Sequence, residues 1–134
     1  MKPIKSRPTR ALPTRAIVKV ADNSGAKEMQ IVNVKQYRGV KRRQPSARVG
    51  DIVVGVVKSG KPEVKHTLVY AVVVRQRQYY KRPSGERIKF EDNAVLILKD
   101  LQTLEPKGTM VKGPIAREAV ERYPKLGKIS KIVV

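Results

Sequence analysis

Short runs of apolar and β-branched residues recur along most of the chain, and each has the length of a typical β-strand. The runs cover residues 16–20, 29–34, 52–57, 68–74, 87–90 and 94–98. Those at 52–57 and 68–74 are almost continuously apolar, which favours strands covered on both faces, as in a closed barrel. The run at 87–90 alternates instead, so that Ile88 and Phe90 would face inward and two bases outward.

Turn-forming residues separate and interrupt these runs. Asp22-Asn23-Ser24-Gly25 lies between the first two runs and ends in a glycine that can adopt positive φ. Gly55 interrupts the run at 52–57, where it fits a β-bulge or a barrel corner. Five or six short strands followed by one late helix predict a mostly β fold, a small β-barrel with a C-terminal loop and short helix.

The only helical pattern lies near the C-terminus, from about residue 113. Pro114 would occupy the first turn, where its missing N–H costs nothing, and Pro124 would end the helix. Glu118 and Arg122 stand four residues apart in the favourable order. The residues that would share its apolar face are Ile115, Ala119, Val120 and Tyr123.

The first fifteen residues differ from the rest in composition. They hold three prolines and five basic residues, without an acidic one. Such a segment buries little apolar area, so we expect an extended basic arm that becomes ordered only against a partner. Residues 16–134 then form a single β-barrel domain.

The charge balance restricts the function more than the pattern does. The 134 residues include 30 Lys and Arg against 11 Asp and Glu, a formal net charge of +19. Nucleic acid is the commonest partner for such a charge, and an anionic membrane surface is the rival. No apolar run approaches the roughly 20 residues needed to span a bilayer, and no secretory signal is visible, so we expect a cytoplasmic protein that does not bind membranes. The sequence has no cysteine, which excludes disulfides and thiolate metal sites.

The first candidate RNA-binding element lies in a stretch without acids between Glu28 and Asp51. An arginine-rich loop from residue 35 to residue 50 falls within it. Guanidinium groups match phosphate bidentately and stack on bases, so we favour an RNA-backbone contact over an ordinary solvated surface. The candidate residues are Lys35, Arg38, Lys41, Arg42, Arg43 and Arg48.

The second candidate element is a basic hairpin that turns at Pro83-Ser84-Gly85. Tyr79 and Tyr80 would point to opposite faces of its first strand. For each tyrosine two roles remain open: stacking on a base or ribose, or packing against the protein. The candidate RNA-binding bases of this hairpin are Arg75, Arg77, Lys81 and Arg82.

The sequence shows no residues with the type and spacing of a catalytic or metal-binding site. His66 is the only histidine and has no nucleophile or metal-ligand spacing around it. Glu91-Asp92-Asn93 lacks the alternate spacing of a calcium loop. We therefore expect no enzyme, no cofactor and no metal site.

Several blocks of sequence, in a fixed order, resemble a known family. They are Ala21-Asp22-Asn23-Ser24-Gly25-Ala26-Lys27, Val49-Gly50-Asp51-Ile52-Val53, Ala71-Val72-Val73-Val74-Arg75, Ile88-Lys89-Phe90-Glu91-Asp92-Asn93-Ala94, Glu105-Pro106-Lys107-Gly108-Thr109 and Gly113-Pro114-Ile115-Ala116-Arg117-Glu118. On these residues the chain resembles the universal large-subunit ribosomal protein 14 family. The N-terminal extension and Val74-Arg75-Gln76-Arg77 are similar to its archaeal and eukaryotic branch.

The resemblance implies a five-stranded barrel that binds large-subunit ribosomal RNA near the subunit interface. It also implies contacts with neighbouring ribosomal proteins, a bridge to small-subunit RNA, and docking of a factor that keeps the subunits apart. Carried over by position, Thr109, Met110, Lys112 and Arg117 would face that interface. Met110 stands where bacterial relatives often have arginine, so Lys112 would have to supply the bridging charge.

Two other functions fit a small basic β protein less well. A free single-stranded nucleic-acid-binding barrel should carry several stacking aromatics, yet aromatic residues make up only 4% of the chain. A nuclease would need paired carboxylates, a histidine-based site or metal ligands. The sequence therefore predicts a structural RNA-binding protein.

Overall fold

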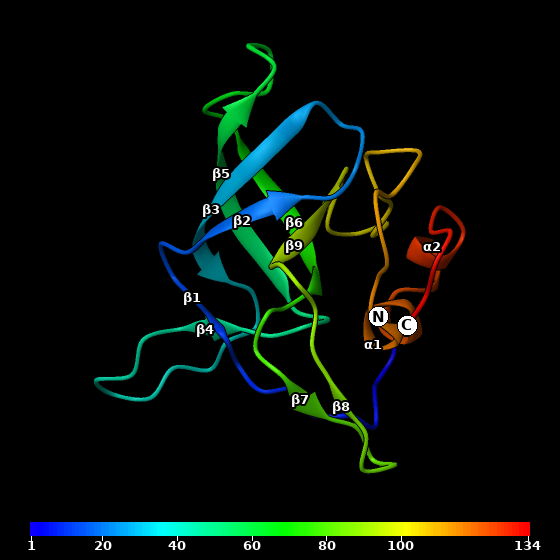
Figure 1. Cartoon of the computed structure of the whole chain (residues 1–134). Helices are drawn as coiled ribbons and strands as arrows, with labels where there is room; N and C mark the ends of the chain where they lie inside the picture. Colours follow the sequence, from blue (N-terminus) through cyan, green and yellow to red (C-terminus); the bar gives the residue numbers. More distant parts are fainter.

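Five strands close into a β-barrel in the computed structural model, which describes residues 1–134 (Figure 1). They are β2 (Ile17–Val20), β3 (Ala26–Val34), β5 (Ile52–Gly60), β6 (Leu68–Arg75) and β9 (Ala94–Leu98). Neighbouring strands are antiparallel except at the closure, where β2 pairs with β9 in parallel. The expected small barrel is confirmed, with five strands as the family resemblance implies.

The barrel wall is covered on both faces at β9 and over residues 71–75 of β6, whereas β5 alternates buried with half-buried residues, so the cover expected for the run at 52–57 is only partial. All five residues of β9 are buried, although only alternate side chains can point into the barrel. The C-terminal segment covers the outside: Pro106 bridges to Leu98, and the N–H of Ala116 donates to the carbonyl of Val74 (3.0 Å). Figure 1 shows this segment beside β9.

Gly55 lies in β5 directly against the backbone of β3. It pairs with Ile31, next to a register shift in β3. A Cβ at this position would lie 2.6 Å from the carbonyl oxygen of Gln30 and 2.8 Å from Cγ of Met29. Gly55 therefore lies beside a bulge-type irregularity and permits close backbone approach, which fits the bulge predicted for it.

The C-terminal helix differs from its prediction at its start. The structure has two short helices, α1 (Arg117–Arg122) and α2 (Pro124–Gly127); α1 ends before Pro124, as predicted, and Pro124 itself begins α2. Ala116 is extended, with φ −70° and ψ 141°. The predicted first turn is wrong because the backbone of Ile115 is paired elsewhere: its N–H donates to Ile132, and its carbonyl accepts from Val134.

The N-terminal arm is extended but packs against the chain's own barrel. Its strand β1 (Leu12–Pro13) pairs with β4 (Ser46–Ala47), and Leu12 is buried. Further back, the N–H of Lys2 donates to the carbonyl of Arg122 in α1 (2.9 Å). The structure therefore differs from the expectation that the arm is ordered only by a partner, because Leu12 and these backbone hydrogen bonds anchor it.

The remaining strands form a small hairpin outside the barrel. β7 (Tyr80–Lys81) pairs with β8 (Arg87–Ile88), which confirms the predicted hairpin. The run at 87–90 is thus not a barrel strand, although Phe90 is buried as expected. No helix is long and apolar enough to cross a membrane.

Candidate nucleic-acid interface

The loop of residues 35–50, called the basic loop below, leaves the barrel after β3 and returns to β5. Gln36 and Arg42 adopt positive φ in it, which keeps its course irregular. The side-chain amide of Gln44 donates to the hydroxyl of Thr14 (2.7 Å) and so fixes the loop to the N-terminal arm. Five predicted RNA-binding residues of this loop are exposed and pair with no acid: Lys35, Arg38, Lys41, Arg42 and Arg43.

The hairpin presents a smaller set of free cations. Arg77 and Lys81 are exposed and also lack an acidic partner. Tyr79 is 47% exposed, and the guanidinium of Arg87 lies 5.5 Å from the centre of its ring. Tyr80 is fully buried, so the two tyrosines do point opposite ways, and only Tyr79 can reach a base.

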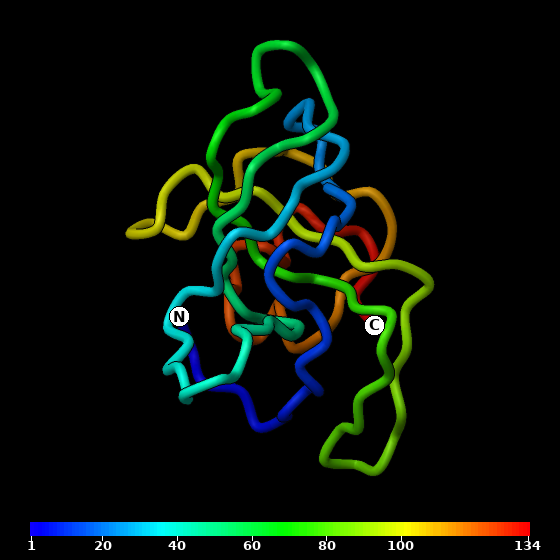
Figure 2. Tube along the Cα trace, turned by 90° about the vertical axis from the view of Figure 1, so that its left-hand side faces the viewer, coloured from blue at the N-terminus to red at the C-terminus, as the bar shows by residue number.

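The basic loop and the hairpin emerge at the same end of the barrel. In Figure 1 both lie in the lower half of the molecule, where the cyan loop reaches to the left and the yellow-green hairpin to the bottom. The view turned by 90° in Figure 2 places them at the same end again, with the N-terminal arm between them. We call this surface the basic end; its exposed candidate residues are Lys35, Arg38, Lys41, Arg42, Arg43, Arg77 and Lys81.

Arg75, another predicted RNA ligand, lies inside the protein. Its Nε donates to Asp92 (2.8 Å), and its Nη1 donates to the carbonyls of Lys112 and Pro114 (2.9 Å each). The side chain is only 9% exposed. Arg75 thus fastens the C-terminal segment to β6, and its donors are not available at the basic end.

Arg82 is likewise buried, in an ion pair with Glu118 of α1. The distance from Arg82 Nε to Glu118 Oε1 is 2.7 Å, and the hydroxyl of Tyr80 donates to Oε2 at 2.7 Å. Burial raises the pKa of Tyr80, and its bond to Glu118 raises it further. Burial acts to lower the pKa of Arg82, but Glu118 and Tyr80 together raise it above its usual value. This cluster joins the hairpin to α1.

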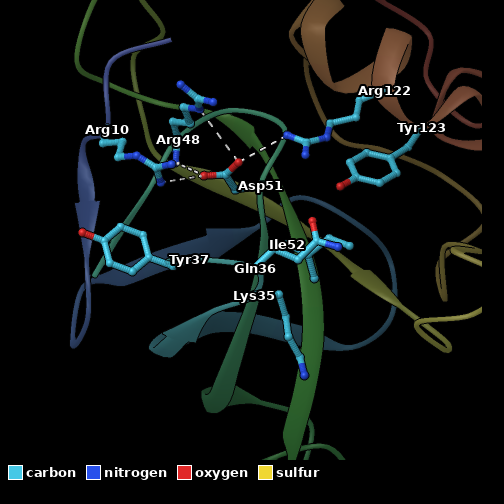
Figure 3. Close-up of a pocket in the computed structure, with 9 residues that line it drawn as sticks. All are labelled: Arg10, Lys35, Gln36, Tyr37, Arg48, Asp51, Ile52, Arg122 and Tyr123. Atoms are coloured by element: carbon cyan, nitrogen blue, oxygen red, sulfur yellow. Dashed lines mark hydrogen bonds and ion pairs between the residues drawn. The ribbon is translucent and has the colours of Figure 1, made fainter. Parts of the chain in front are cut away.

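Arg48 has a third environment, half-buried beside Asp51 (Figure 3). Its backbone N–H donates to Asp51 Oδ2 (3.2 Å), and its Nε lies 3.9 Å from Oδ1. Arg10 and Arg122 also reach the same carboxylate, at 3.3 and 3.4 Å. These two arginines could not be found from the sequence because they are far from residue 51 along the chain, although Asp51 ends the stretch without acids.

The predicted interface residues near the C-terminus are exposed and rigidly held. Asn23 accepts a hydrogen bond from the N–H of Thr109 (2.9 Å) and donates one to its hydroxyl (2.9 Å). The N–H of Lys112 donates to the carbonyl of Ala21 (2.6 Å). Met110, Lys112 and Arg117 all expose their side chains. In Figure 1 this segment lies beside β9, away from the basic loop.

The barrel and its charged surfaces define a class of protein. No group of three or more His, Asp or Glu side chains could hold a metal ion, and His66 stands alone on the surface. The exposed cations instead gather where two irregular elements leave a rigid barrel. Fold and surface together define the class of small β-barrel proteins with a basic surface, of the kind that suits a polyanion.

Comparison with known proteins identifies the family. The sequence model described as ribosomal protein L14p/L23e matches residues 11–134. The chain is 47% identical to the large ribosomal subunit protein uL14 of Methanocella arvoryzae, 49% to that of Methanoregula boonei and 50% to that of Nanoarchaeum equitans. Each similarity spans 134 residues and the whole of both chains. The chain belongs to the ribosomal protein L14p/L23e family.

Family membership confirms the resemblance drawn from the sequence blocks, including its archaeal character. The chain is a protein of the large ribosomal subunit, a cytoplasmic particle, and its role there is structural and not enzymatic. Membership of that subunit implies ribosomal RNA and other ribosomal proteins as partners.

Proposed function

We propose that the basic end binds large-subunit ribosomal RNA near the subunit interface. The observation that carries this proposal is the grouping of the free cations. Within the two predicted RNA-binding elements, the cations that pair internally are buried or half-buried, whereas those at the basic end are exposed and have no acidic partner. Cations left unpaired by their own fold are available for phosphate.

The mechanism is positioning rather than chemistry. The closed barrel is a rigid mount, and the basic loop and hairpin neutralise phosphates and fix the local path of the RNA. Recognition depends on the shape of the RNA backbone, because paired RNA hides its base edges in a deep, narrow groove. Each neutralised phosphate releases counterion, so affinity falls steeply as salt rises.

Tyr79 adds a second kind of contact to the basic end. Its exposed ring projects from the hairpin beside Arg87, and exposed aromatic rings on RNA-binding proteins stack on unpaired bases. We therefore propose that the ring of Tyr79 stacks on an unpaired base of the same RNA.

A second surface, around Thr109, Met110, Lys112 and Arg117, serves contacts across the subunit interface. We assign it the bridge to small-subunit RNA, neighbouring ribosomal proteins and the factor that keeps the subunits apart. Asn23 holds this segment in one conformation, and Lys112 and Arg117 supply exposed charge. Lys112 supplies the positive charge that bacterial relatives often have as an arginine at the position of Met110.

Charge reversal in the basic loop tests the RNA-binding proposal. The double variant Arg42→Glu/Arg43→Glu should fold normally, because both side chains are exposed, but should enter large subunits poorly. The matched control is Lys58→Glu/Lys65→Glu, which changes the charge equally near the β5–β6 loop. Incorporation is measured by sedimentation of the tagged protein before and after a high-salt wash. Equal retention of both variants in the subunit peak would contradict the proposal, and a wild-type protein that runs free would favour a free single-strand binder.

A further inference from the structure

Three arginines from distant segments converge on Asp51 in a cavity of about 210 Å³ (Figure 3). Arg10 comes from the N-terminal arm, Arg48 from the basic loop and Arg122 from the end of α1. In Figure 3 their guanidinium groups approach the carboxylate from different sides, whereas the side chain of Lys35 is turned away. The cavity therefore lies where three parts of the fold meet.

The charges around this cavity do not balance. Asp51 is the only acid that lines it, so one carboxylate faces three guanidinium groups. Burial lowers the pKa of Arg48, and the nearby Arg10, Arg122 and Arg7 lower it further, while Asp51 acts to raise it. A net positive charge thus remains in a partly buried site, where solvent screens it poorly.

Two hydrogen-bond donors in the cluster are also unsatisfied. The Nε groups of Arg48 and Arg122 are buried and find no acceptor in the protein. Most buried polar groups in folded proteins have a partner, and one without a partner needs an explanation. Asp51 cannot satisfy both groups, because its oxygens already accept from Arg10, Arg122 and the backbone of Arg48.

A purely structural role explains only part of this arrangement. Asp51 does tie the arm, the loop and the helix together, and one or two arginines would suffice for that. A third arginine adds repulsion between like charges without adding an acceptor. An additional anion would satisfy both the excess charge and the free donors.

We propose that this cavity binds a phosphate group, held by Arg10, Arg48 and Arg122 beside Asp51. Guanidinium groups are the side chains best matched to phosphate, because their donors form a planar fork. The proposal rests on the proposed RNA binding for the source of the phosphate, a phosphodiester of the RNA backbone. RNA bound there would also hold the N-terminal arm against α1.

The first experiment uses inorganic phosphate and the full chain. At equal ionic strength, phosphate should raise the melting temperature of the wild type more than chloride does. The variants Arg10→Gln and Arg122→Gln should each bind phosphate at least tenfold more weakly. The control Lys65→Gln removes one exposed cation of the β5–β6 loop, outside both the cavity and the basic end, and should behave like the wild type. Equal losses in Lys65→Gln and Arg122→Gln, or no specific effect of phosphate on the wild type, would overturn the proposal.

Asp51→Asn separates the phosphate site from a structural tie. If the cavity binds phosphate, removing the competing carboxylate should tighten phosphate binding in the folded variant. If the cluster only joins segments, the same change should leave phosphate binding unchanged, which would count against the site. Arg122→Lys, which keeps the charge near Asp51, serves where Arg122→Gln fails to fold, and should show an intermediate loss.

The second experiment identifies the source of the phosphate by filter binding of a large-subunit RNA fragment at several salt concentrations. Arg122→Gln should lower the slope of log affinity against log salt by about one unit. If Arg122→Gln binds inorganic phosphate more weakly but keeps the wild-type salt slope for RNA, the phosphate in the cavity does not come from the RNA backbone. If Arg42→Glu/Arg43→Glu binds the RNA normally while Arg122→Gln binds it more weakly, the proposed role of the basic loop is wrong. The proposed phosphate site in the cavity would then still hold.

Discussion

Replacing Glu118 by glutamine should destabilise the protein strongly, because it leaves a buried charge without its counterion. Glu118 accepts hydrogen bonds from Tyr80 and from two nitrogens of Arg82, and the two charged side chains are 3% and 6% exposed. Glutamine keeps the shape but turns an NH₂ group toward the donors. Removing one partner of a buried pair costs about 3–5 kcal/mol, whereas an exposed pair contributes about 0–1 kcal/mol.

Urea unfolding of the purified protein, followed by circular dichroism, measures this cost. Glu121→Gln is the control, since Glu121 is exposed in the same helix and makes no ion pair; its change should stay within about 0.5 kcal/mol. The double variant Arg82→Met/Glu118→Gln should be more stable than Glu118→Gln alone, because no buried charge remains. A cost below about 1 kcal/mol for Glu118→Gln would refute the reasoning.

Three further predictions follow from other sites. Gly55→Ala should lower the free energy of unfolding by about 1–3 kcal/mol, because the added methyl group overpacks against Gln30 and Met29. Gly39→Ala, where nothing lies within 4 Å of the added group, should change the free energy little, and urea unfolding of both variants measures the difference. Burial raises the pKa of Tyr123 to about 12, with Arg122 opposing the shift and Asp51 adding to it, so the unfolded chain loses this proton first. The free energy of unfolding should therefore fall as pH rises from about 10 toward 12, and a fall just as large in Tyr123→Phe would contradict this. Tyr79→Ala should weaken binding of an rRNA fragment by about 1–3 kcal/mol and Tyr79→Phe should not, since stacking needs the ring and not the hydroxyl; equal affinities in filter binding would exclude stacking.

The barrel could be predicted from the sequence because its signal is local. The runs at 52–57 and 68–74 are almost continuously apolar, and both form strands of the barrel, with residues 71–75 of β6 all buried. The start of the helix could not be predicted, because it depends on pairing between Ile115 and Val133, which no local pattern reveals.

Among the candidate RNA-binding residues, the sequence likewise predicts where bases cluster but not which of them stay free of an acidic partner. Arg42 and Arg75 look alike in the sequence, since each lies among other bases. Only the fold shows that Arg75 meets Asp92, just before the neighbouring strand β9, and that Arg82 meets Glu118 from a helix 36 positions away. A count of nearby charges finds a basic segment, but the position of a distant acid decides which of its bases remain free.

The parallel pairing of β2 with β9 also has a consequence for synthesis of the chain. The barrel cannot close until Leu98 has been made, which is roughly 4 to 16 s after Val20 at about 5–20 residues per second. In that interval β2 and β6 each lack a neighbour, and exposed strand edges of this kind pair with other chains. The basic loop is made before β9 and carries no acid, so two nascent chains at this stage repel each other. The charge of the basic loop thus opposes pairing between open sheets while the last strand is still being made.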